Sequence, residues 1–213
     1  MARKANRIDA NARQRIAQEA ARLIVEHGIK DFQMAKQKAA HGFGVTDKHV
    51  IPSNMEVEQA LLEHQRLFHS ESQPLRLKEL RETAIKAMQM LKSFEPRLVG
   101  SVQRGTAGEY SDVNLHIFLD SPESFGHFLD QHTIPYEQRE KRVRISKEQY
   151  ENFPSYSFIA GNVPIDIVVF PIMAQRQAPL SPVDGKPMRR DDVAKVEAAL
   201  LLWGSSLERP FIT

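Results

Sequence analysis

The chain has 213 residues and no cysteine, which excludes disulfide-stapled domains, thiolate zinc sites and cysteine nucleophiles. Hydrophobic residues make up 41% and charged residues 26% of the sequence, as in ordinary soluble globular proteins. No apolar run approaches the ~20 residues of a membrane span, and the N-terminus lacks the apolar segment of a signal peptide. We therefore expect a cytoplasmic protein with no membrane partner.

The formal net charge of +2 is unevenly distributed. Residues 1–48 hold ten Lys and Arg against five Asp and Glu, so the rest of the chain is acidic. A basic segment of this kind indicates either a solvated helix face or contact with a polyanionic partner.

The first half of the chain, residues 9–93, has the apolar spacing of helices. Asp9 is predicted to cap a first helix that ends at Gly28, and Asp31 a second that ends at Gly42. Each of these helices would bury one apolar stripe.

Two more helices are predicted before residue 93. Ser53 and Glu56 have the spacing of a capping box, which opens a third helix that ends near Ser70. Pro74 suits the first turn of a fourth helix that continues to Leu91.

The pattern changes after Pro96, where short apolar runs alternate with turns. We predict, in order, a strand broken at Gly100, a strand over 113–119, a helix over 122–132, a basic hairpin arm over 139–147, a strand over 163–170 and a final helix over 190–203. This order indicates a helical N-terminal module (1–93), an α/β core of the α+β kind (94–178) and a C-terminal loop and helix packing on that core (179–213).

Three polar features of the core suggest chemistry. A tight turn at Gly100–Ser101 would expose backbone N–H groups and a hydroxyl to a phosphate. Asp112 and Asn114 alternate with apolar residues and so share one face of a strand. Asp166 lies within a β-branched strand, where a carboxylate needs a partner. Oxygen ligands of this kind suit Mg²⁺.

These elements resemble, over residues 97–170, the nucleotidyltransferase superfamily represented by DNA polymerase beta. The resemblance implies a mixed sheet with flanking helices, two metal ions (Mg²⁺ or Mn²⁺), and transfer of a nucleoside monophosphate from an NTP to a hydroxyl acceptor with release of pyrophosphate. It implies that Gly100 and Ser101 bind the triphosphate and that Asp112 ligates metal. Asp166 would ligate metal and accept the proton of the incoming hydroxyl.

Asn114 departs from this pattern, which has a second Asp at that position. An amide oxygen can still ligate a cation, but the site loses one negative charge. Two functions are therefore left open: an active nucleotidyltransferase, and a catalytically weak protein of the same fold that binds nucleotide, nucleic acid or a protein. The acceptor is also open and includes RNA ends, small hydroxylated molecules and protein side chains.

Further residues near the motif are candidates for lesser roles. Arg104 is a candidate phosphate contact, and His116, which follows Asn114 on its strand face, a candidate contact to phosphate or acceptor. Asp166 could instead form a structural ion pair with Arg104 or Arg144.

The stretch over residues 15–29 is similar to the first helix of TetR-type repressors. The similarity ends where a recognition helix should follow, because Pro52 interrupts the segment that begins at Val45. We expect no sequence-specific binding to duplex DNA.

Overall fold

The computed structural model describes residues 2–207, with side-chain surroundings for residues 9–202. The chain divides into two compact units. The first consists of the residues up to Pro74 and the second of those from Leu75 onward, except that Gly108–Ser111 and Pro182–Asp184 belong to the first. None of the helices in the described part of the chain has the length and apolar character needed to cross a membrane.

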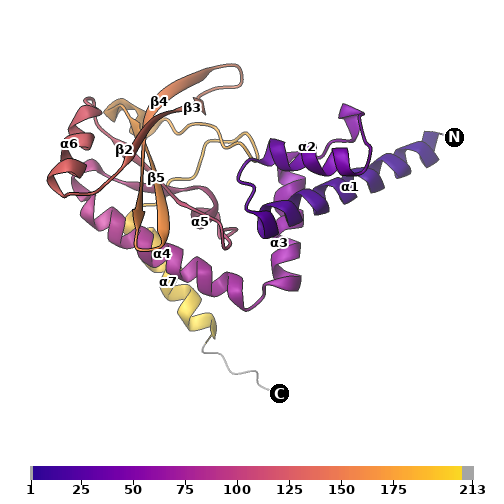
Figure 1. The fold of residues 1–213 in the computed structure, drawn as a ribbon, viewed down its shortest axis with the longest axis horizontal. Helices are drawn as coiled ribbons and strands as arrows, with labels where there is room; N and C mark the ends of the chain where they lie inside the picture. Colours follow the sequence, from indigo (N-terminus) through magenta and orange to yellow (C-terminus); the bar gives the residue numbers. More distant parts are fainter. Residues whose placement is uncertain (1, 208–213) are drawn as a thin grey trace. The chain divides into compact units, whose positions relative to one another are not determined.

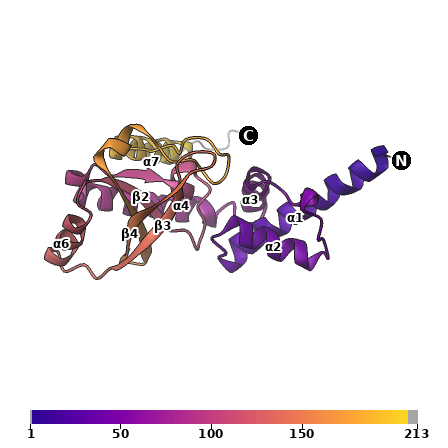
Figure 2. The same cartoon turned by 90° about the horizontal axis from the view of Figure 1, so that it is seen from above.

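The first unit is built from three helices and a single 3-10 turn (Figure 2). They are α1 (Ala2–His27), α2 (Phe32–Gly42), η1 (Lys48–Val50) and α3 (Asn54–Phe68). Their shared core is small and rich in alanine, with Ile16, Val57 and Leu61 as its larger members. Alanine at these positions lets the helices pack closely.

Two predicted helix starts in this unit are confirmed. The Asp31 side chain accepts a hydrogen bond from the Met34 backbone N–H, and Ser53 and Glu56 form the capping box. The prediction for Asp9 is wrong, because α1 begins at Ala2 and Asp9 lies inside it. Nothing in the preceding residues breaks a helix, since they include neither proline nor glycine.

The second unit contains a five-stranded mixed sheet in the order β1-β2-β5-β4-β3 (Figure 1). Only the β2–β5 pair is parallel, and the other three pairs are antiparallel. The elements are α4 (Ser72–Met90), η2 (Lys92–Phe94), β1 (Arg97–Val99), α5 (Gly100–Arg104), β2 (Val113–Phe118), α6 (Glu123–Gln131), β3 (Glu137–Arg144), β4 (Tyr150–Ala160), β5 (Val163–Phe170), η3 (Ile172–Arg176) and α7 (Val193–Leu207). The expected mixed sheet with flanking helices is therefore present.

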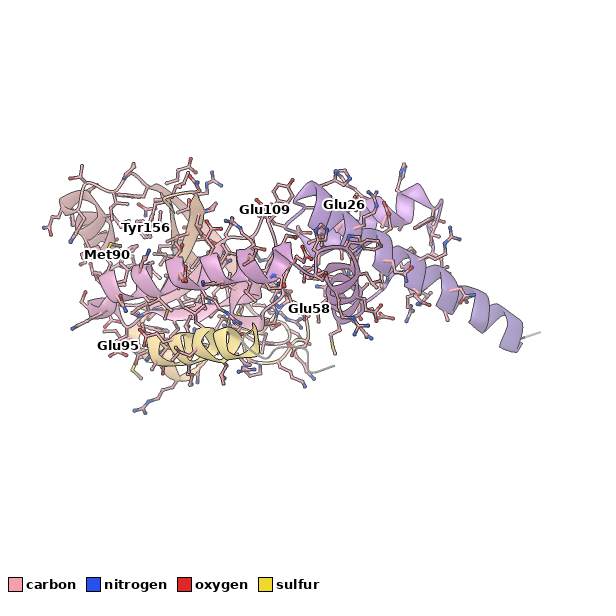
Figure 3. All side chains as sticks on the ribbon, turned by 90° about the horizontal axis from the view of Figure 1, so that it is seen from below. Glu26, Glu58, Met90, Glu95, Glu109 and Tyr156 are labelled. Atoms are coloured by element: carbon pink, nitrogen blue, oxygen red, sulfur yellow. The ribbon has the colours of Figure 1, made fainter. Side chains whose placement is uncertain are left out.

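One face of this sheet is the apolar core of the unit. Leu115 of β2 and Ile167 of β5 are fully buried there, together with side chains from α4, α6 and α7. Helix α7 lies alongside α4, where Gln89 Nε2 donates to Glu197 Oε1 at 3.2 Å (Figure 3). Helix α4 thus packs with the sheet, although the sequence grouped it with the N-terminal helices.

Two elements differ from the sequence-based expectation. Strand β4 was not predicted, because its first half is polar and exposed and it contains Pro154. The final helix begins at Val193 and not at residue 190, because Asp192 caps it by accepting from the Lys195 backbone N–H at 3.0 Å. Trp203, the predicted last residue of this helix, has a side chain outside the described set.

Candidate functional site

The second face of the sheet is polar at one end and aromatic at the other. Because side chains alternate along a strand, Asn114 and His116 point away from the core that holds Leu115. The parallel register pairs Asn114 with Asp166 and His116 with Val168. The amide and the carboxylate therefore project from neighbouring strands on the same face.

Gly100 brings the start of α5 against this polar end. It has φ +78 directly after β1, and a Cβ there would lie 3.5 Å from the Cβ of Asn114. Val99 pairs with Asn114 and is the N-cap residue of α5, and its side chain makes no capping hydrogen bond to the helix. The first backbone N–H groups of any helix lack partners within it, so the first turn of α5 offers donors beside Asn114, close to the sequence prediction of a tight turn.

The remaining predicted residues lie on α5 and just before β2. Ser101 is half-buried in the first turn of α5, and Arg104 is exposed at its last turn. Asp112 immediately precedes β2, and its backbone oxygen accepts a hydrogen bond from Asn114 Nδ2 at 3.2 Å. The amide nitrogen of Asn114 therefore faces the backbone of Asp112.

Asp166 has two partners that the sequence did not indicate. Lys141 of β3 forms an ion pair with Asp166 Oδ2, and the Ser155 hydroxyl donates to Asp166 Oδ1 at 3.4 Å. The ion pair that the sequence suggested for Asp166 is thus present, with Lys141 as its cation in place of Arg104 or Arg144. The guanidinium of Arg144 donates to the backbone oxygens of Ser146 and Lys147.

His116 is held in a buried aromatic cluster. Its side chain is 4% exposed, its Nδ1 lies 3.1 Å from the donating Nε of Arg190, and its ring centroid is 4.6 Å from that of Phe170. Burial, with the charges of Arg190 and Lys141, keeps the pKa of His116 well below its ordinary value. The ring is therefore neutral at physiological pH, and its contact with phosphate or acceptor stays a prediction.

Arg190 fastens the C-terminal loop to this cluster. Its Nη1 donates to Ala174 O at 2.8 Å, and its guanidinium carbon lies 4.9 Å from the ring centroid of Phe118. Burial, together with the charge of Arg97, lowers the pKa of Arg190 to about 10, so the side chain is still charged at neutral pH. The sequence placed Arg190 in a helix and did not single it out.

The donor set at the polar end fits one divalent cation better than two. Asp112 and Asp166 offer carboxylates and Asn114 an amide oxygen, which are ligands that Mg²⁺ accepts. In the described part of the chain, no three His, Cys, Asp or Glu side chains gather as a metal site. The ammonium group of Lys141 is paired with Asp166, so a divalent cation at this carboxylate would compete with the lysine.

The fold is that of an α/β domain in which Asn114 and Asp166 lie together on one face of a mixed sheet. Residues 81–176 match the model of a protein family described as nucleotidyltransferase domain. This match, which covers a little under half of the chain, is consistent with the nucleotidyltransferase superfamily. A search of the curated proteins found no match.

Proposed function

We propose that the domain transfers a nucleoside monophosphate from an NTP to a hydroxyl acceptor such as an RNA end. The pairing of Asn114 with Asp166 supports this most directly, because it joins the two later motif residues on one sheet face beside Gly100. These residues all lie inside the segment that matches the nucleotidyltransferase family.

In this proposal the acceptor oxygen attacks the α-phosphorus of the NTP. A new O–Pα bond forms, the bond from Pα to the bridging oxygen breaks, and pyrophosphate leaves. Asp166 accepts the proton of the acceptor hydroxyl. Gly100 and Ser101 hold the triphosphate through backbone and hydroxyl donors, and Arg104 adds a positive charge.

Asp112, Asn114 and Asp166 would hold a single Mg²⁺ or Mn²⁺. When bound, such a cation neutralises the charge of the triphosphate. The residues of this corner would bind and orient the nucleotide in an active enzyme and in a catalytically weak protein alike.

A second function is supported by the charges at the site. Asn114 replaces a carboxylate, and Lys141 neutralises Asp166. In this second proposal the domain lacks the charge needed for turnover and serves to bind a nucleotide, a nucleic acid or a protein. 

A labelling experiment separates the two functions. The full chain is incubated with each α-³²P-labelled NTP, Mg²⁺ or Mn²⁺, and total RNA or lysate. Transfer of label to an acceptor supports the enzyme, and the same reaction with γ-labelled NTP should transfer none. Asp112→Asn should abolish transfer, and Asp130→Asn, at an exposed position of α6, should leave it unchanged. NTP binding without transfer from any NTP would favour the binding protein.

A further inference from the structure

Lys141 and Asp166 meet across an intervening strand. Lys141 is on β3 and Asp166 on β5, with β4 between them. The β3–β4 register pairs Lys141 with Phe153, which packs on the sheet face opposite the main core. The lysine side chain therefore spans β4 on the same face as the candidate site and ends at the carboxylate.

This ion pair is accessible to solvent. The side chain of Lys141 is 42% exposed and that of Asp166 is 23% exposed. Pairs at such positions contribute little to stability, because water and salt screen them. Incoming groups can therefore replace either partner at low cost.

The charge of the corner differs from that of a site built for two divalent cations. Asp112 and Asp166 carry two negative charges, Asn114 carries none, and Lys141 adds one positive charge. These four side chains sum to −1, and Arg104, the candidate phosphate contact, cancels that charge, so the corner offers little net attraction for two dications. An ammonium group is, however, an effective point-charge partner for phosphate oxygens.

We propose that Lys141 is a built-in cation of the nucleotide site. Without nucleotide it neutralises Asp166. When an NTP binds, the ammonium group moves to the triphosphate and releases Asp166, so that Lys141 takes the place of one of two divalent cations. This inference rests on the proposed function only in requiring that the same corner binds an NTP.

Two consequences follow. A divalent cation competes with Lys141 for Asp166, so removal of the lysine charge strengthens metal binding. Triphosphate binding, in contrast, does not depend wholly on divalent cations, because the lysine charge stays in the site when they are removed.

The test uses the full chain and measures two affinities separately. Mn²⁺ alone is titrated by electron paramagnetic resonance, and a fluorescent ATP analogue is titrated in EDTA and in Mg²⁺. The variants are Lys141→Met, which removes the charge at similar length, and Lys141→Arg, which keeps it. Lys147→Met, in the exposed β3–β4 turn, is the matched control. Circular dichroism and the thermal midpoint check that each variant folds.

We expect the wild-type chain to bind the ATP analogue in EDTA. Lys141→Met should weaken that binding about tenfold or more, the loss of one charged hydrogen bond, and should bind Mn²⁺ alone severalfold more tightly. Lys141→Arg and Lys147→Met should resemble wild type in EDTA. The inference is overturned if wild type binds the analogue only with divalent metal, or if Lys141→Met leaves either affinity unchanged.

The outcomes distinguish this inference from the proposed function. Absence of ATP-analogue binding by wild type in both EDTA and Mg²⁺ would refute the nucleotide site itself. The Mn²⁺ titration needs no nucleotide, so an unchanged Mn²⁺ affinity in Lys141→Met refutes the role of Lys141 even if NTP binding and transfer are observed.

Discussion

Asn114 of β2 and Asp166 of β5 are register partners on the only parallel pair of strands in the described sheet. Their neighbours Leu115 and Ile167 are fully buried on the opposite face. The apolar core therefore fixes the direction in which the amide and the carboxylate project, because a one-residue slip of either strand would bury them.

Substitution of Gly100 should separate backbone strain from nucleotide binding. Gly100→Ala puts a side chain at φ +78 and against Asn114, and the strained backbone should cost about 1–2 kcal/mol of stability. Gly161→Ala is the matched control, because φ there is +63 with nothing within 4 Å of the added Cβ. Both should lower the thermal midpoint, but only Gly100→Ala should weaken NTP binding. Equal NTP affinities in the two variants would remove Gly100 from the site.

The hydroxyl of Ser101 should contribute to triphosphate binding. Ser101→Ala removes one hydrogen bond to a charged group, which we expect to weaken NTP binding by about 1.5–3 kcal/mol. Calorimetry measures this directly, and an unchanged dissociation constant would exclude the hydroxyl as a phosphate contact.

The residue at position 114 should set the metal affinity. Asn114→Asp adds a carboxylate, so Mg²⁺ should raise the thermal midpoint at lower concentrations than in wild type. Without metal the same variant should be less stable, because nearby carboxylates repel one another. Asp112→Asn should reverse both effects. Identical Mg²⁺ titrations for Asn114→Asp and wild type would show that Asn114 does not face the cation.

His64 of the first unit should make stability depend on pH. Burial lowers its pKa, although Glu26 partly opposes this effect. Because the unfolded chain takes up the proton near pH 6.5 and the folded chain resists it, the unfolding free energy should fall as pH drops below ~6.5. The slope contributed by His64 should stay below ~1.4 kcal/mol per pH unit.

Urea unfolding at pH 7.5 and 5.5 tests the role of His64. His64→Gln should lose less stability between the two values than wild type, and His41→Gln, whose side chain is exposed on α2, should behave like wild type. The same loss in His64→Gln as in wild type would assign the pH dependence to other groups.

Arg190 should stabilise the second unit far more than its neighbour Arg189. Arg190→Met removes the hydrogen bonds to His116 and Ala174 and the stacking on Phe118, with an expected loss of about 2–4 kcal/mol. Arg189→Met, at an exposed position, should cost less than ~0.5 kcal/mol. Urea unfolding compares the two, and equal losses would mean that the contacts of Arg190 with His116, Ala174 and Phe118 contribute nothing.

The full chain should not bind duplex DNA in a sequence-specific way. Where a recognition helix would follow α2, the chain forms only η1, which has three residues. Contact by the basic N-terminal segment would depend on charge alone and weaken steeply as salt rises. A gel-shift assay over a salt series measures this, and a salt-resistant, sequence-dependent shift would contradict the expectation.

The sequence predicted elements whose causes are local. The Ser53–Glu56 capping box, the Asp31 cap and the strand at 163–170 depend on neighbouring residues, and all three are present. Strand β4 depends instead on pairing with other strands. Its residues 150–157 pair with β3 and its residues 155–160 with β5. Pairing with distant strands leaves little signal in a segment that contains Pro154.

The same division applies to the site. The spacing of Asp112 and Asn114 and the apolar context of Asp166 predicted from the sequence alone that these residues form one site. All three lie inside the segment that matches the nucleotidyltransferase family. The identity of the cation at Asp166 was decided by tertiary structure. Lys141 reaches Asp166 only because β3, β4 and β5 pair in one particular register. That register is set by packing between the strands and not by the local sequence of any one of them.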